Sequence, residues 1–173
     1  MKIGSALALL LLVGSASVRS EDIPTPASAI SFAINKDSRK WTPQHQAGNS
    51  TRIILEMVPR GDSIEKWKEL VAVQIDFARA PLRLFVDTWK GLLVKADPKV
   101  ELKEEIANDG SIVLTYKSPA ANEFSQRRFM KGSDAVYMLA YHVRPKLKNE
   151  ARFKTWSGII TSATLVPNPE KRK

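Results

Sequence analysis

The sequence contains no cysteine, and only two of its 173 residues are histidines. No disulfide framework can form, and no lipid can be attached to an N-terminal cysteine after processing. Common catalytic and metal-site motifs are also missing: there is no G-x-S-x-G elbow, H-x-x-H pair, acidic calcium loop or phosphate-binding glycine motif. We therefore expect no cofactor and no metal site, and the sequence favours a non-enzymatic protein over an enzyme.

The N-terminus has the layout of a secretory signal peptide. Lys2 is followed by an apolar run over residues 6–13 and then by small residues. The run is far shorter than the roughly 20 apolar residues that span a bilayer. Cleavage after Ala16, Ser17 or Ser20 fits the pattern, and we take residues 1–20 as the signal peptide. The sequence thus predicts a periplasmic or secreted protein with no transmembrane anchor after cleavage.

The remaining chain is long enough for one domain. Residues 21–29 are polar and proline-rich, which is typical of a flexible leader. Residues 30–167 then form a single α+β domain, and residues 168–173 form a basic C-terminal tail. A chain of this size buries about 70% of its unfolded surface without needing disulfides or metal ions for stability.

The first half of the domain is expected to combine strands with two helices. The pattern predicts a strand over residues 29–34, a loop over 35–50 and a strand over 50–59 that Pro59 ends. Asp62 and Glu65 form a capping box for a helix over residues 62–78. Its buried stripe would be formed by Ile64, Trp67, Val71, Ile75 and Ala78. Pro81 then starts a second helix, which "ADP" ends.

The second half is expected to form two hairpins and a helix. Residues 99–118 would turn at Asn-Asp-Gly with Gly110 at positive φ, pairing Ile106 with Ile112 and Leu102 with Tyr116. Residues 122–144 would turn at Gly132 and Ser133. A final helix over residues 149–166 would begin with Asn149 as its cap.

This order of elements predicts an α+β fold with a mainly antiparallel sheet. The strand "AVYMLAYHV" is apolar on both faces. Such a strand needs cover on both sides, so we expect helices on both faces of the sheet, an α/β/α sandwich.

A resemblance supports the same fold. A strand ending in Val58 and Pro59 leads through Gly61 to Trp67 and Gln74, a pattern similar to one in uncharacterised secreted bacterial proteins. The element order, and a closing helix with Trp156 after a long hairpin, resemble the PsbP-like fold, which includes DcrB-like envelope proteins. The resemblance implies a fold and carries no catalytic residues.

Glu123 and His142 form the first candidate site. With the turn at Gly132 and Ser133, Glu123 faces His142 across the second hairpin. A carboxylate beside an imidazole could form a proton-transfer dyad, raising the histidine pKa and stabilising the fold below pH ~6.5. The pair would then support a hydrolase. An ordinary cross-strand pair at the sheet edge explains the same spacing.

Trp41 and His45 form the second candidate site. Trp67, Trp89 and Trp156 lie in helical apolar stripes, where core packing explains them. Trp41 lies in the expected polar loop with His45, and no packing pattern accounts for it. These two residues could contact a small ligand in a pocket beside the sheet.

Charge is the third functional feature. Residues 124–173 contain 11 basic and 3 acidic residues, a net charge of +8, whereas residues 21–123 have a net charge of −1. Such a field attracts polyanions, and outside the cytoplasm these are lipid headgroups, lipopolysaccharide, acidic glycans or acidic proteins. Nucleic acid is not expected there. Solubility alone explains the excess equally well. The candidate basic face comprises Arg127, Arg128, Lys131, Arg144, Lys146, Lys148, Arg152 and Lys154.

Overall fold

The computed structural model describes residues 23–172, which fold mainly into β-strands. The expected signal peptide, residues 1–20, lies outside the described residues. Nine strands are present in the described part: β1 Ser28–Ser31, β2 Trp41–Gly48, β3 Arg52–Pro59, β4 Glu69–Asp76, β5 Glu101–Ile106, β6 Ile112–Ser118, β7 Glu123–Lys131, β8 Val136–Val143 and β9 Thr164–Pro167.

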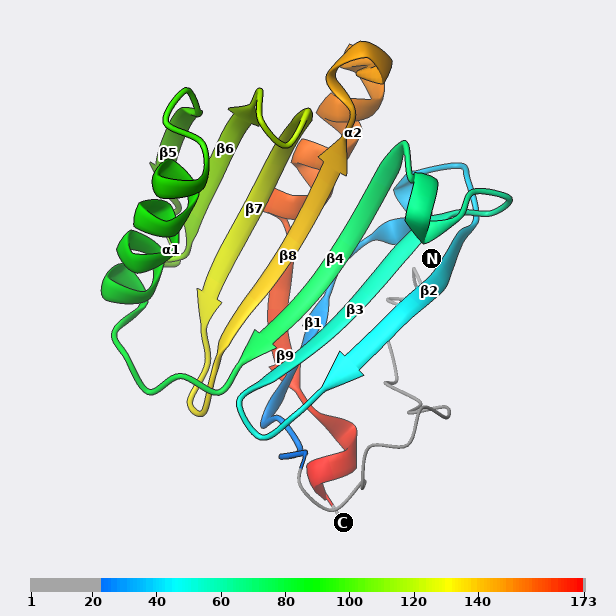
Figure 1. Cartoon of the computed structure of the whole chain (residues 1–173). Coiled ribbons are helices and arrows are strands. Elements are labelled where there is room, and N and C mark those ends of the chain that lie inside the picture. The colour runs from blue at the N-terminus through cyan, green and yellow to red at the C-terminus, as the bar shows by residue number, and fades with distance from the viewer. Residues whose placement is uncertain (1–22, 173) are drawn as a thin grey trace.

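Seven of the strands form one antiparallel sheet in the order β2-β3-β4-β8-β7-β6-β5. The sheet consists of two meanders, β2-β3-β4 and β5-β6-β7-β8, which meet where β4 pairs with β8 (Figure 1). Helix α1, Leu82–Ala96, connects the meanders and lies against one face of the sheet. Helix α2, Glu150–Thr161, and the two-stranded β1-β9 ribbon lie against the opposite face.

The expected α+β sandwich with helices covering both faces is wrong. The described chain is mostly β, with two short α-helices. On the first face α1 packs over β6, β7 and β8 and leaves the β2-β3 side without a helix. On the second face α2 shares the cover with the β1-β9 ribbon. The central strand is nevertheless buried on both faces, since all eight residues of β8 are buried.

The helix expected over residues 62–78 is also wrong. The segment forms a single 3-10 turn, Ile64–Lys66, and then strand β4. Seven of the eight residues of β4 are buried, so an apolar spacing of three and four there reflects burial on both faces of a strand. The β-branched Val71, Val73 and Ile75 favour the strand.

The loop expected over residues 35–50 contains strand β2. This strand lies at the sheet edge, and most of its residues are exposed, so apolar alternation is absent from its sequence. Its pairing with β3 is interrupted by an irregularity between Pro43 and His45. A proline and a bulge both blunt an edge strand against pairing with other chains.

The elements expected in the second half are largely confirmed. Gly110 has a φ of +77°, Ile106 pairs with Ile112, and Leu102 pairs with Tyr116. Asn149 caps α2, its side chain accepting a hydrogen bond from the Arg152 backbone N–H at 3.0 Å. Helix α2 ends at Thr161, however, and residues 164–167 form β9 instead of continuing it. Pro81 immediately precedes α1, as expected.

The register of the β7-β8 hairpin differs from the expected one by two residues. Lys131 pairs with Val136, so the loop is 132–135, and Ser125 pairs with His142. Because side chains alternate with a period of two, this shift keeps each residue on its expected face. Glu123 is therefore a diagonal neighbour of His142.

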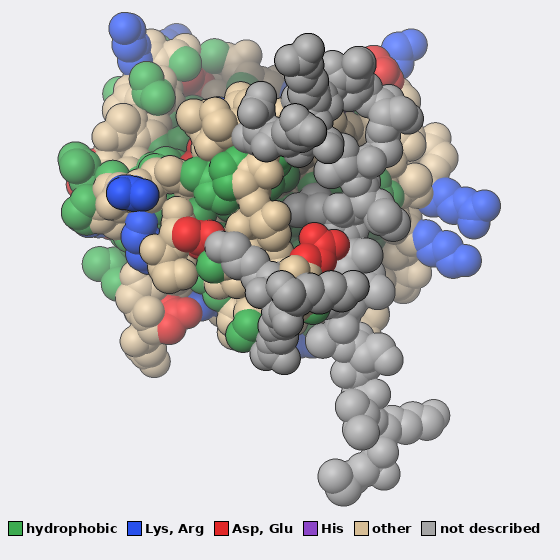
Figure 2. Space-filling view, turned by 90° about the horizontal axis from the view of Figure 1, so that it is seen from below, with side chains coloured by type: hydrophobic (Ala, Val, Ile, Leu, Met, Phe, Trp, Pro, Cys, Tyr) green, Lys and Arg blue, Asp and Glu red, His purple; other side chains and the backbone are tan. Residues whose placement is uncertain are grey.

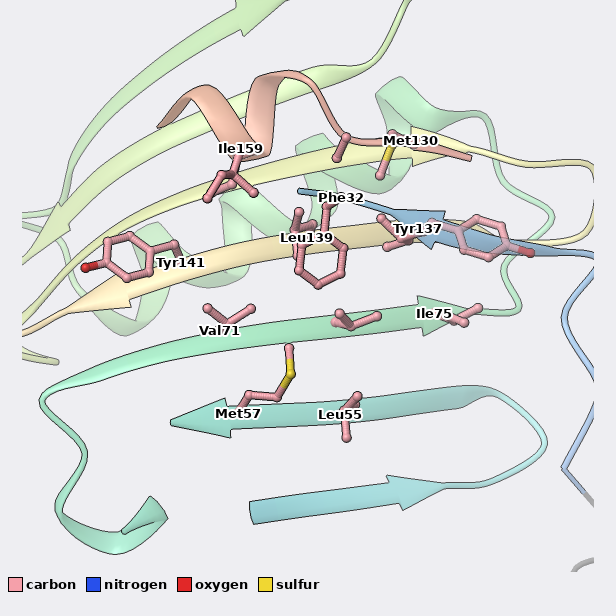
Figure 3. Close-up of a cluster of buried hydrophobic side chains, with 14 of the residues drawn as sticks. Phe32, Leu55, Met57, Val71, Ile75, Met130, Tyr137, Leu139, Tyr141 and Ile159 are labelled. Carbon is pink, nitrogen blue, oxygen red and sulfur yellow. The ribbon is translucent and has the colours of Figure 1, made fainter. Parts of the chain in front are cut away.

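Two hydrophobic clusters hold the layers together. The larger one lies between the sheet and the α2 and β1-β9 layer, where Phe32, Leu139 and Ile159 meet side chains from β3, β4 and β8 (Figure 3). The smaller one lies under α1, centred on the fully buried Val86 and Phe129. At roughly 1.5–3 kcal/mol for each large buried apolar side chain, these clusters dominate the stability of the domain.

The two ends of the described chain lie together. Ser28 pairs with Pro167, and the Asn168 side chain donates a hydrogen bond to the Pro26 carbonyl at 2.9 Å. Ala27 N–H donates to Asp134 at 2.6 Å, so the part of the expected leader nearest β1 is attached to the domain. Residues 169–172 of the expected tail form a 3-10 turn.

Candidate functional site

The expected contact between Glu123 and His142 is formed. His142 Nδ1 lies 2.7 Å from Glu123 Oε1. An ionised carboxylate only accepts hydrogen bonds, so the imidazole carries its proton on Nδ1 and donates it. Among the described residues no partner contacts Nε2. The histidine has the orientation of a base held by a carboxylate.

A chain of donors extends behind Glu123. Tyr116 donates its hydroxyl proton to Glu123 Oε1 at 2.5 Å, and Arg127 Nη2 donates to the Tyr116 oxygen at 2.7 Å. The Arg127 guanidinium lies over the Trp89 ring at 4.5 Å. Its Nε is buried without a hydrogen-bond partner, and Nη1 reaches only the Met138 sulfur at 3.6 Å.

Burial sets the charge states in this cluster. Burial lowers the pKa of His142, and the Arg127 cation lowers it further, while Glu123 acts in the opposite direction. Burial opposes ionisation of Glu123, but hydrogen bonds from His142 and Tyr116 and the charge of Arg127 lower its pKa to about 2. Burial raises the pKa of Tyr116 to about 12. At neutral pH the cluster therefore contains an anionic glutamate and a neutral histidine.

The expectation of a raised histidine pKa is wrong for a physical reason. The sequence suggested a partly solvated strand end, whereas only 4% of His142 is exposed. The same burial limits chemistry at this pair. Ser125, which is opposite His142, is completely buried and offers no accessible nucleophile.

A second polar cluster fastens α2 and the segment before β2 to the sheet. Buried Glu69 accepts hydrogen bonds from Arg39 at 3.0 and 2.9 Å and from Tyr141 and Arg152. Arg39 also binds Asp37 through two bonds of 3.0 and 2.7 Å. Burial opposes ionisation of Glu69, but these hydrogen bonds and cations keep its pKa below the usual range. The cluster has a structural role, because its charges are fully paired.

The structure does not bring Trp41 and His45 together. Trp41 is half-buried and packs against the large core cluster, lying edge-on to Trp156 with ring centroids 5.1 Å apart. His45 pairs with Glu56 on the other face of β2 and is exposed. Core packing thus accounts for the tryptophan that the sequence left unexplained.

Of the expected basic-face residues, Arg128 is buried and Arg127 is half-buried. Arg128 is 4% exposed and donates to Ser111 Oγ at 2.9 Å, to Asp109 at 2.6 Å and to carbonyls at the end of α2. Arg127 belongs to the Glu123 cluster. Neither can act as an exposed docking cation. Lys131 is exposed but lies at the other end of β7, where its Nζ donates to the Ala78 carbonyl at 3.1 Å.

The remaining expected cations lie near lysines and arginines of the first half of the chain, which the sequence analysis had not grouped with them. Strands β2, β3, β4 and β8 all have an end at the upper edge of the sheet in Figure 1. Arg60 N–H donates to the Lys40 carbonyl at 2.8 Å, and Arg144 N–H donates to the Lys68 carbonyl at 3.0 Å. We call this edge the basic rim, formed by Lys40, Arg60, Lys66, Lys68, Arg144, Lys146 and Lys148.

Most of the positive charge on the basic rim faces solvent. Within it, Arg144 and Lys148 are half-buried and the other five residues are exposed. The Arg144 guanidinium lies over the Trp67 ring at 3.8 Å, and Lys148 lies over Phe124 at 4.3 Å. Three acidic residues are nearby: Asp62 is 3.9 Å from Lys68, Glu150 is 2.8 Å from Lys148, and Glu65 is exposed. The rim keeps a positive excess.

Arg152 and Lys154 continue from the basic rim along α2. Arg152 is half-buried and bound to Glu69, whereas Lys154 is exposed. The opposite end of the molecule has a different distribution. There, the lysine and arginine side chains in view lie mostly toward the outline of the molecule (Figure 2).

A pocket of about 310 Å³ lies at this lower end, away from the basic rim. It is lined by the β5-β6 turn, the end of β7, the start of α1 and β9, with Asp109 and Lys131 as its charged residues. Asp109 is already bound to Arg128 and Ser111. Lys131 is likewise bound to the Ala78 carbonyl, so both charged residues of the pocket already have partners.

Comparisons with known proteins leave the function to be argued from the structure. No protein-family model matches the chain, and a search of curated proteins finds no significant match. Within residues 23–172, no helix is long and apolar enough to span a membrane. In the same residues, no group of three histidine or acidic side chains is placed to hold a metal ion.

Proposed function

We propose that this protein is a non-enzymatic binding protein that docks an anionic partner on the basic rim. One observation carries the proposal: cations from three separate segments converge at one end of four adjacent strands, and these segments are Lys40, residues 60–68 and residues 144–148. Convergent charge of one sign raises the local potential and attracts polyanions. The proposal includes a periplasmic or secreted location, which rests on the sequence of residues 1–20.

Retention on heparin resin tests the proposal. The chain should bind at low salt and elute as salt screens the interaction. Lys66→Glu combined with Lys146→Glu should lower the elution salt, because both side chains are exposed on the rim. The matched control, Arg79→Glu with Lys103→Glu, changes the net charge equally at exposed positions elsewhere. Salt-insensitive retention, or equal loss in both variants, would contradict docking at the rim.

A hydrolase is a second candidate, favoured by the 2.7 Å contact between Glu123 and His142. The neutral imidazole and its unpartnered Nε2 suit a general base. Only 4% of His142 is exposed and Ser125 is completely buried, so substrate access to this pair is restricted. Turnover of p-nitrophenyl acetate that is lost in His142→Gln would support this candidate, and equal background rates would exclude it.

A further inference from the structure

Two loops of the basic rim carry the same short pattern, an apolar side chain between two lysines. Trp67 lies between Lys66 and Lys68, and Leu147 lies between Lys146 and Lys148. Leu147 is 47% exposed, whereas the leucines of the central strands β3, β4 and β8, Leu55, Leu70 and Leu139, are buried. Trp67 is half-buried.

The two loops are neighbours in the fold. Arg144, which follows β8, donates its backbone N–H to Lys68, which precedes β4, at 3.0 Å. The Arg144 side chain covers one face of the Trp67 ring at 3.8 Å. The tryptophan is therefore fixed at the protein surface, with cations on both sides of it in the sequence and one stacked on its ring.

We infer that the basic rim docks on an anionic lipid bilayer, with Leu147 and the exposed part of Trp67 entering the headgroup layer; this inference rests on the proposed function. Lysines beside an anionic surface attract its headgroups, and amphipathic tryptophan and apolar tips gain from the interfacial layer below. A soluble polyanion has no apolar layer, so it would leave Leu147 in water.

Other exposed apolar side chains lack this setting. Leu84 and Leu92 lie on α1, and Ile106 ends β5 at the far end of the sheet from the rim. Ile106 is 67% exposed, more than Leu147, and its neighbours include no lysine pair. It provides a matched control for apolar contact away from the rim.

Co-sedimentation of the chain without its expected signal peptide, residues 21–173, with vesicles tests the inference. Binding to vesicles with 30% phosphatidylserine or phosphatidylglycerol should exceed binding to neutral phosphatidylcholine vesicles and should fall with salt. Each rim cation removed should cost about fivefold in partitioning. Leu147→Ser should weaken binding roughly tenfold, while Ile106→Ser should leave it unchanged. Brominated lipids should quench fluorescence of the native protein more than that of Trp67→Phe.

Each outcome separates the inference from the proposed function. Salt-dependent retention on heparin without binding to anionic vesicles would overturn the membrane inference and leave anion docking standing. That result would point to an acidic glycan or protein. Loss of vesicle binding in Ile106→Ser as large as in Leu147→Ser would also overturn it. Failure on both heparin and vesicles would remove both proposals.

Discussion

The His142 imidazole binds Glu123 diagonally across the β7-β8 hairpin, although the residue directly opposite His142 is Ser125. Nδ1 and Oε1 are 2.7 Å apart, and the side chain of His142 is almost completely buried. A buried imidazole beside a buried carboxylate is a strongly coupled pair, and burial decides its charge state.

We expect the pKa of His142 to lie below its ordinary value of about 6.5, because burial and Arg127 disfavour the imidazolium. Glu123→Gln should lower the pKa further by removing the anion that binds Nδ1 of the ring. Arg127→Gln should raise it. NMR titration of the His142 ring protons measures all three values. An unchanged pKa in Glu123→Gln would contradict the contact.

The lowered pKa also fixes how this residue affects stability. As pH falls below about 6.5, the unfolded chain binds a proton at His142 more readily than the folded one, so the free energy of unfolding decreases. Glu123, with a pKa lowered from 4.5 to about 2, loses its stabilising effect only as pH falls through that lower range. Urea unfolding of the native protein and of His142→Gln, each at pH 7.5 and 5.5, measures this change in the free energy of unfolding. The native protein should lose more stability on acidification than the variant.

Glu69 should be among the most costly carboxylates to remove. Its carboxylate is 7% exposed and contacts two arginines and Tyr141. Glu69→Ala leaves those cations without their anion and should destabilise the domain by about 3–5 kcal/mol. Glu105→Ala, at an exposed ion pair with Lys103, should cost about 0–1 kcal/mol. Urea denaturation compares the two, and equal midpoints would show that the cluster is not stabilising.

Gly132 and Gly158 should respond in opposite directions to alanine. A Cβ on Gly132 would lie 2.5 Å from Tyr137 Cε2, and the ring of Tyr137 is fixed by full burial and by its hydrogen bond to Asp134. Gly132→Ala should destabilise by about 1–3 kcal/mol. Gly158 lies in α2 with nothing within 4 Å of its added Cβ, so Gly158→Ala should stabilise by about 0.5–1 kcal/mol. Thermal unfolding measures both changes, and a neutral Gly132→Ala would mean that Tyr137 can move.

The sequence predicted correctly those turns and helix ends that depend on a few neighbouring residues. The Asn-Asp-Gly turn determined the β5-β6 register, and the Asn149 cap and the spacing of Trp156 and Ile160 identified α2. The Glu123–His142 contact was also predicted, even though the loop is longer than expected. A register shift of two preserves the face of every residue, which explains this success.

Elements whose identity depends on the rest of the sheet were not predictable in this way. Strand β4 is apolar because two layers cover it, so helical and strand periods both fit its sequence. Strand β2 is polar because it lies at an exposed edge. The basic rim was missed for a related reason: Lys40, Arg60 and Lys68 lie in a segment without net positive charge, and only strand order places them beside Arg144.

The two meanders are joined by one strand pairing, β4 with β8, which we call the seam, and this pairing affects the order of folding. All other pairings of the seven-stranded sheet join consecutive strands, whereas β4 and β8 are separated by roughly 60 residues. The hairpins can form before β4 pairs with β8, because closing the loop between these two strands is the entropically costly step. The rim cations Lys68 and Arg144 lie at the two sides of this seam. The basic rim is therefore assembled only when the least local pairing of the seven-stranded sheet forms.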